Sequence, residues 1–366
     1  MKTIVITLFI LTYVIMLTLP KYRQYAAAAV AVVMVILGVV SPLEAVNAID
    51  WNVIMMLAGT MGTVYLCIES KMPAMVRDML VNKLKSVKLI FVALALFSGF
   101  VSAFIDNVAT VLMVAPIALA IAKKFNVSPV NTVLTVAVSS NLQGAATLVG
   151  DTTSILLAGY AGMDFMDFFV IDGKPGMFWV VQAGAVATIP ILFWIFRKEK
   201  NRIETTEITK VTDFMPTYAL LATVISLVIA SFIPNKPALT NGLICVFFFI
   251  AVLRYEVGRD EPVATGHDAV LAIDFDTLLL LSGLFVIIQA VTNVGLIDDI
   301  SNAFVNIAGD NLFKIYTILV WFSVLVSAFI DNIPYVATML PVVSGISAQL
   351  GLDPTLLYFG LLAGAT

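Results

Sequence analysis

Two acidic residues stand inside long apolar segments of this chain, each followed by an asparagine. The heptapeptide VSAFIDN at residues 101–107 recurs unchanged at residues 326–332. Both copies end with the same polar pair: Asp106-Asn107 and Asp331-Asn332. An ionisable side chain within a mostly apolar run is costly unless it is paired or neutralised, so it is a candidate functional group. Such a carboxylate can bind a cation, or take a proton where burial raises its pKa.

A purely structural role is the alternative for these residues, because Asp and Asn are also good N-caps of helices. Ser or Thr would cap a helix without bringing a carboxylate into an apolar segment, however. We therefore expect Asp106 and Asp331 to take part in ion binding.

A second polar stretch, SSNLQGAATLVGDTTS at residues 139–154, interrupts the apolar segment 132–163. Its glycines, hydroxyls and acid suit a broken helix whose unwound backbone lines a cavity. Oxygen ligands of this kind suit a small cation, whereas helix N-termini directed at the membrane midplane suit an anion. The candidate ion-binding or substrate-binding residues are Ser102, Asp106, Asn107, Thr110, Asn141, Thr147, Gly150, Asp151, Thr152, Asp331 and Asn332. Within this set, Asp106, Asn107 and Asn141 are the candidate sodium ligands.

The composition places these residues in a membrane. Of the 366 residues, 61% are hydrophobic and only 12% are charged, and the mean hydropathy is +1.03. The sequence shows no cluster of basic residues of the kind that would indicate a nucleic-acid partner. Cys67 and Cys245 fall inside apolar segments, where helix packing is the expected role, and His267 lies in a polar loop. We expect no cofactor other than a coupling proton or sodium ion.

The repeat extends beyond the heptapeptide, since Ile49-Asp50 recurs as Ile273-Asp274. Apolar residues 89–104 and 108–122 would each form about 23 Å of helix, which is short for a hydrocarbon core of about 30 Å. They therefore predict a re-entrant hairpin at residues 89–122, and residues 313–350 predict a second. Amphipathic interfacial helices are expected before them, at residues 72–88 and 297–308.

The distribution of charge favours the hairpin. With it, one side of the membrane receives all of the 20 Lys and Arg residues except Lys2, Lys174, Lys236 and Lys314, in agreement with the positive-inside rule. A single crossing by residues 89–122 would move the basic residues 197–202 to the other side. Each repeat then has five crossings and one hairpin, and the odd number inverts the second repeat.

The predicted fold is an all-α polytopic membrane protein with two inverted-topology repeats. The first repeat spans residues 1–213, with its hairpin at 89–122 and its broken helix at 132–163. The second spans residues 214–366, with its hairpin at 313–350. Because Asn141 aligns with Thr366 at the 225-residue offset, the second broken helix stops short. We expect the natural product to continue by about 55 residues, and the 366-residue form to insert without transporting.

Two motifs resemble the paired signatures of the ion transporter superfamily. They are SAFIDNVAT at residues 102–110, followed by Pro116, and NLQGAATLVGD at residues 141–151. This superfamily includes arsenite efflux permeases, one type of bacterial sodium/proton antiporter, the melanosomal P protein, and citrate and dicarboxylate permeases. The resemblance implies that the hairpin tips and broken helices form the site, and that transport is an elevator or rocking movement.

Details of the motifs bear on the branch of the superfamily. The Asp-Asn tip is more similar to the antiporter, arsenite and P-protein branches than to the dicarboxylate branch, whose tips read Ser-Asn-Thr. Thr152-Thr153-Ser154 departs from the Pro-Pro-Asn or Pro-Thr-Asn that often follows Gly-Asp in relatives.

The predicted function is secondary active transport across the plasma (inner) membrane, coupled to a proton or sodium gradient. The substrate is a small inorganic ion, moved by sodium/proton antiport or arsenite-like oxyanion efflux; the alternative is a citrate or dicarboxylate permease for a small organic anion. The partner is the lipid bilayer, and a homodimer is compatible with this function. A passive channel could share the fold. An intramembrane aspartyl protease could use Gly150-Asp151, but the Tyr-Asp partner motif is missing, so we expect no enzymatic activity.

Overall fold

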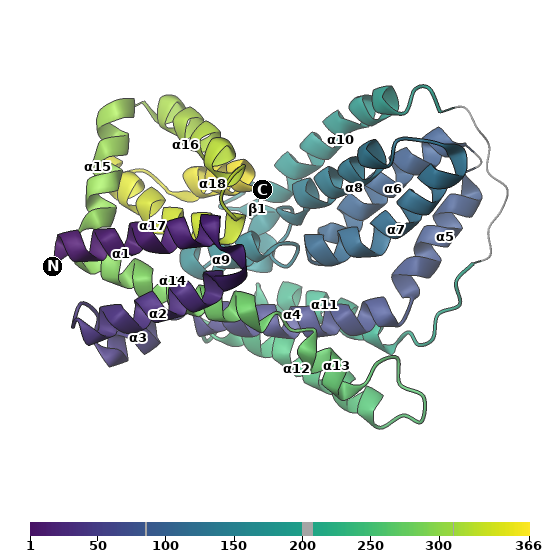
Figure 1. The fold of residues 1–366 in the computed structure, drawn as a ribbon, viewed down its shortest axis with the longest axis horizontal. Coiled ribbons are helices and arrows are strands. Elements are labelled where there is room, and N and C mark those ends of the chain that lie inside the picture. The colour runs from purple at the N-terminus through teal and green to yellow at the C-terminus, as the bar shows by residue number, and fades with distance from the viewer. Residues whose placement is uncertain (85, 200–207, 310) are drawn as a thin grey trace. The chain divides into compact units, whose positions relative to one another are not determined.

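A computed structural model of the chain describes residues 1–84, 86–199, 208–309 and 311–366. Helices make up nearly all of the regular structure in these residues (Figure 1). They are α1 (Lys2–Thr18), α2 (Arg23–Ile36), α3 (Pro42–Ala48), α4 (Trp51–Glu69), α5 (Met72–Lys83), α6 (Val87–Ser102), α7 (Asn107–Phe125), α8 (Pro129–Gly144), α9 (Thr152–Ala161), α10 (Met177–Ile195), α11 (Met215–Ala230), α12 (Thr240–Val257), α13 (Gly266–Leu271), α14 (Phe275–Asn293), α15 (Leu296–Ala308), α16 (Leu312–Ser327), α17 (Asn332–Leu350) and α18 (Thr355–Ala365). The connections include the 3-10 turns η1 (Pro20–Tyr22) and η2 (Phe165–Phe168), and an antiparallel ribbon of β1 (Val170–Ile171) and β2 (Lys174–Pro175).

The helices confirm a polytopic membrane protein. In the described part of the chain, 6 helices are long and apolar enough to cross a membrane, or up to 7 if the bent pair α15 and α16 forms one span. Shorter apolar helices, among them α1, α6 and α18, accompany them. The predicted all-α fold class is therefore correct.

The chain forms two compact units. The first unit comprises residues 1–54, 156–162 and 274–366, and the second comprises residues 55–155 and 163–273. Each unit thus combines the first two helices of one repeat with the hairpin of the other repeat. The repeat boundary at residue 213 stays a prediction, because repeats are defined by sequence and these units by packing.

Glycines allow the closest of these helix contacts. A Cβ atom at Gly59 of α4 would lie 2.4 Å from the backbone of Cys245 in α12. A Cβ atom at the equivalent Gly283 of α14 would lie 2.7 Å from the backbone of Ala27 in α2. Small residues let helix backbones approach closely in a membrane, where packing rather than the hydrophobic effect holds helices together. As predicted, Cys67 and Cys245 are buried and free, as parts of packed helices.

The first predicted hairpin corresponds to α6 and α7. Val87 at the start of α6 shares an apolar cluster with Ala122 and Val127 at the far end of α7. The two arms therefore run antiparallel and bring their outer ends together, which shows a helical hairpin. Its re-entrant course in the membrane stays a prediction. The second arm runs past its predicted end at Ala122 to Phe125.

The second hairpin, α16 and α17, follows the same local rules. Each second arm contains a proline at the same position, Pro116 or Pro341. Each also ends at a residue in the left-handed region, Asn126 with φ 54° and Gly351 with φ 63°. Asn and Gly adopt this helix-terminating conformation most readily, so the two hairpins stop at equivalent positions for the same reason.

The predicted broken helix is also present. Helix α8 ends at Gly144, residues 145–151 are not helical, and α9 begins at Thr152. The break coincides with the polar stretch, and it lies beside the first hairpin tip.

The remaining differences from prediction concern short or charged segments. Helix α5 ends at Lys83 rather than at residue 88, because Leu84 adopts an extended conformation with φ −107° and ψ 111°. The predictions did not include α3, α13, η2 or the ribbon, which are too short to show an apolar period. Three basic residues of the charge assignment, Lys85, Lys200 and Arg202, lie outside the described residues.

Candidate functional site

Asp106 begins the second arm of the first hairpin. Its Oδ2 atom accepts hydrogen bonds from the backbone N–H groups of Val108 at 3.0 Å and Ala109 at 3.2 Å. This is the N-cap of α7, where the partial positive charge of the helix end favours a carboxylate. The structural role considered above is therefore real, and any role in ion binding is additional to it.

The hairpin tip is joined to α8 by its asparagine. Asn107 Nδ2 donates to Asn141 Oδ1 at 2.9 Å, and Ser140 Oγ donates to the backbone carbonyl of Asn107 at 3.2 Å. These bonds bring two of the three candidate sodium ligands into direct contact, next to the third, Asp106. The same bonds hold the tip in register with the end of α8.

The break between α8 and α9 packs directly on the tip. Thr147 Oγ1 donates to the carbonyl of Ala103. A Cβ atom at Gly150 would lie 2.5 Å from the carbonyl oxygen of Gly144, 2.7 Å from that of Ser102 and 2.8 Å from that of Ala103. No side chain fits at this position, so a glycine is required for the tip and the break to approach.

Asp151 ends the break and is only 6% exposed. Thr153 Oγ1 donates to Asp151 Oδ2 at 2.8 Å. Thr152 is also buried, and Thr110 Oγ1 donates to the carbonyl of Ile105 at 3.4 Å. Ser102 and Ser154 have buried hydroxyls with no hydrogen-bond partner among the described residues. Buried hydroxyls without a protein partner are uncommon in folded proteins.

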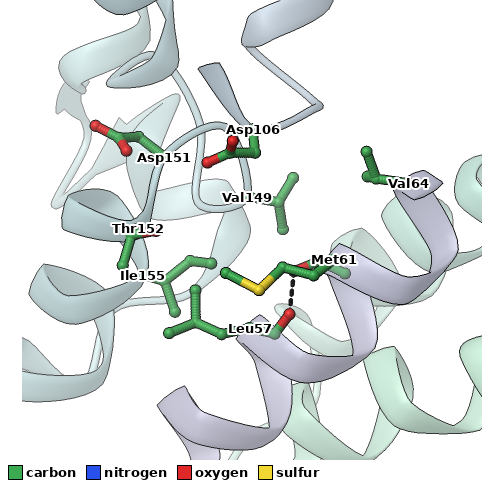
Figure 2. Close-up of a pocket in the computed structure, with 9 residues that line it drawn as sticks. Leu57, Met61, Val64, Asp106, Val149, Asp151, Thr152 and Ile155 are labelled. Atoms are coloured by element: carbon green, nitrogen blue, oxygen red, sulfur yellow. Dashed lines mark hydrogen bonds between the residues drawn. The ribbon is translucent and has the colours of Figure 1, made fainter. Parts of the chain in front are cut away.

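A pocket opens at this position. It contains about 300 Å³ of space, part of it open to solvent. Its lining residues come from α4, the hairpin tip, the break and α9: Leu57, Thr60, Met61, Val64, Asp106, Val149, Asp151, Thr152 and Ile155. Figure 2 shows the two carboxylates at one side of the pocket, with Leu57, Met61 and Ile155 on the other side. Acidic residues are present among the described lining residues, but basic ones are not.

The second hairpin tip, in the first unit, has a different environment. Asp331 caps α17 by accepting from the backbone N–H of Ile333 at 3.0 Å. Its other carboxylate oxygen is bound by the guanidinium of Arg23. Arg23 lies in the first turn of α2 and pairs with this hairpin tip. Asn332 Oδ1 accepts from Ser327 Oγ at 2.6 Å.

Comparison with known proteins assigns the family. A family model described as citrate transporter (CitMHS) matches residues 8–364. The chain belongs to this family.

Relatives described as transporters match this citrate transporter family member over nearly its whole length. An uncharacterized transporter of Mycobacterium tuberculosis is 28% identical over 363 residues, which is 97% of this chain and 83% of the relative. The P protein of Homo sapiens is 23% identical over 356 residues, covering 75% of this chain and 42% of that protein. The resemblance to the ion transporter superfamily is thereby confirmed.

A solved structure agrees with the fold. The YdaH transporter of Alcanivorax borkumensis, described as having an unusual topology, matches with a TM-score of 0.55. The match covers 91% of this chain and 76% of that chain at 14% identity, and therefore supports the fold alone. Together, the family and the helices establish a multi-pass integral membrane transporter of the plasma membrane, as predicted.

The structure of this citrate transporter family member gathers most of the predicted site residues. Asp106, Asp151 and Thr152 line the pocket. Around the same tip and break lie Ser102, Asn107, Thr110, Asn141, Thr147 and Gly150. Asp331 and Asn332 belong to the first unit and are described with it.

Sequence reasoning missed the wall that α4 contributes to the pocket. Thr60 lies on this wall, together with the apolar side chains of Leu57, Met61 and Val64. The spacing of the three apolar residues places them on one helix face, which is a signal that the sequence does contain. It could not show which other segment this face meets.

Proposed function

We propose that this chain is a secondary active transporter in which a coupling cation, a proton or sodium, binds beside Asp106. The observation that carries the proposal is the pocket at the first hairpin tip, where Asp106 and Asp151 both contribute to the lining. Two carboxylates in one site of low dielectric favour a cation or a shared proton. Sodium would meet the hard oxygen ligands that such cations prefer.

The surroundings of the tip support the same proposal. The buried Ser102 hydroxyl, with no hydrogen-bond partner among the described residues, can serve as a ligand to a bound cation. Asn141 supplies an amide oxygen next to the tip, and the break supplies backbone groups. A helix cap alone would not require a second acid, the buried Asp151, at this place.

For the substrate, we propose a small ion moved by sodium/proton antiport or by efflux of an arsenite-like oxyanion. The Asp-Asn tip and the similarity to the P protein favour this choice. The second candidate is import of citrate or a dicarboxylate, which is favoured by the description of the matching family. Such an anion would require positive charge, which the described lining of the pocket does not offer.

A flux screen in proteoliposomes that contain the full-length natural product tests this proposal. Sodium, lithium, arsenite and citrate are each offered with and without a pH gradient. We expect one of them to accumulate against its gradient only when a proton or sodium gradient is applied. Flux that merely follows the substrate gradient would identify a passive channel, and citrate accumulation would favour the second candidate.

A further inference from the structure

At the second hairpin tip, Arg23 forms an ion pair with Asp331, which is the residue equivalent to Asp106 in the second repeat. Arg23 Nη1 binds Asp331 Oδ2, while Asp331 Oδ1 caps α17. The side chains are 31% and 36% exposed, respectively, so the pair is partly withdrawn from solvent. A guanidinium remains charged at every physiological pH, and it occupies the place beside Asp331 that a bound cation would take.

The fold of the first unit holds Arg23 in this place. The turn η1 ends at Tyr22, and Arg23 follows as the first residue of α2. Helix α1 is joined to α17 by Tyr13, whose hydroxyl donates to the carbonyl of Pro334 at 2.8 Å. Helix α2 is packed against α14 at Gly283. The guanidinium is therefore positioned by two helices that both contact the core of this unit.

The repeat does not supply an arginine to the equivalent position of the other unit. Gly59 contacts Cys245 of α12 as Gly283 contacts Ala27 of α2, so Cys245 corresponds to Ala27. Four residues earlier on each helix, Asn241 then corresponds to Arg23. The neutral Asn241 side chain bonds to Lys236 at 3.2 Å and to Asp164 at 3.5 Å. The arginine is thus an asymmetric feature of the two repeats.

We propose that Arg23 is a built-in cation of the second hairpin tip, which keeps Asp331 from binding sodium. The proposal rests on the proposed function in one respect, that a hairpin-tip aspartate can bind a coupling cation. It follows that the two repeats are not equivalent in coupling, although their tips have the same sequence. Neutralising Arg23 should create a sodium site that the natural protein does not have.

The test is a sodium titration of thermal unfolding on the purified full chain, with choline as the inert replacement cation. A ligand that binds only the folded state raises its stability in proportion to the logarithm of ligand concentration, once for each site. If the first tip binds one sodium, Arg23→Gln should about double the slope of unfolding temperature against the logarithm of sodium concentration. If sodium does not change the unfolding temperature of the wild type, it should still raise the unfolding temperature of Arg23→Gln.

Three matched variants separate this effect from a general loss of charge. Arg23→Lys keeps the cation and should keep the wild-type slope. The double variant Arg23→Gln with Asp331→Asn removes the new site and should also show the wild-type slope. Lys2→Gln breaks another ion pair of the same unit, with Asp299 at 2.6 Å, and should change nothing.

Two results would overturn the proposal: an unchanged sodium slope in Arg23→Gln, or an increased slope that persists after Asp331→Asn. If Arg23→Gln does not fold in choline, its folded yield should recover in sodium, and equal loss in both salts contradicts the proposal. The proposed function is tested separately, because its failure would appear as a wild type with no coupled flux, whatever the Arg23 variants do.

Discussion

Ser102 and Ser327 occupy equivalent positions before the two hairpin tips, but their hydroxyls have different surroundings. Ser327 Oγ lies 2.6 Å from Asn332 Oδ1 and 2.7 Å from the carbonyl oxygen of Ala365, and it can donate its one proton to either acceptor. Ser102 Oγ is buried without a hydrogen-bond partner among the described residues. A buried polar group without a partner lowers stability, whereas a bonded one contributes about 1 kcal/mol.

This difference predicts opposite results for one substitution. Ser102→Ala should leave the unfolding temperature in sodium-free buffer unchanged or higher, and should weaken the stabilisation by the coupling ion. Ser327→Ala should lower stability by about 1 kcal/mol through loss of its bonds. Thermal unfolding with and without sodium measures both. A large loss of stability in sodium-free Ser102→Ala would show that its hydroxyl is structural.

Gly150 controls the approach of the break to the hairpin tip. In Gly150→Ala the new methyl group would meet three carbonyl oxygens within 2.8 Å, and overpacking of this kind costs about 1–3 kcal/mol. We expect coupled flux to fall at least about tenfold, because a displacement of about 1 Å at a functional site can already cost a hundredfold. Gly184→Ala is the control, since its Cβ atom would meet only Leu142 at an ordinary 3.6 Å. Equal flux in both variants would contradict the requirement for a glycine at position 150.

At the scale of elements, the hairpin makes a topological prediction. Ser86 precedes α6 and Asn126 follows α7, and the adjoining residues Val87 and Val127 share one apolar cluster. Single cysteines at these two positions, in a background without Cys67 and Cys245, should react with an impermeant reagent from the same side. A cysteine at Asp172, in the ribbon turn, should react from the other. Labelling of positions 86 and 126 from opposite sides would show a single crossing.

The short helix α3 is attached to α14 by Glu44. Its carboxylate accepts from Asn293 at 2.8 Å and from Gln289 at 3.2 Å. The hydrogen bond from Asn293 and the backbone N–H of Ser41 hold the pKa of Glu44 below its ordinary value. Because the folded pKa is the lower one, this contribution to stability is present above the unfolded value of about 4.3. It is lost as the pH falls through the folded value.

The pH dependence of Glu44→Gln checks this attachment. The variant should unfold at a lower temperature than the wild type near neutral pH. The difference should close as the pH falls from the ordinary carboxyl value of about 4.3 through the lowered pKa of folded Glu44, where the wild-type carboxylate takes up its proton. A difference that stays constant across this range would mean that the charge of Glu44 does not hold α3.

The elements that could be predicted are those with a chemical marker in the chain. Asp106 and Asn126 mark the two ends of α7, and Gly144 and Gly150 mark the broken helix, because caps and glycines interrupt apolar runs locally. The pairing of Arg23 with Asp331 could not be predicted, since it joins positions 308 residues apart. The wall of the pocket from α4 depends on the same kind of distant packing. The positions where helices end or break were therefore predictable, but the distant residues that these positions contact were not.

At the scale of the whole molecule, the units exchange segments between the repeats. The first unit needs residues 1–54 together with residues 274–366, and the second contains α4 and α12 in close contact. Fragments 1–213 and 214–366 should therefore be degraded when expressed singly and should co-purify when expressed together. Membrane insertion with resistance to protease measures this outcome. A stable fragment 214–366 on its own would contradict the exchange.

Transport coupled through Asp106 is the central claim for the molecule. The most direct test is gradient-driven uptake into proteoliposomes by the full-length natural product with Asp106→Asn, and with the exposed turn residue Asp172→Asn as the matched control. Asparagine keeps the oxygen that caps α7 but cannot carry the charge or the proton. We expect Asp106→Asn to fold and insert normally yet lose gradient-driven uptake, while Asp172→Asn retains it. Wild-type uptake by Asp106→Asn would contradict the coupling role and leave the residue as a helix cap.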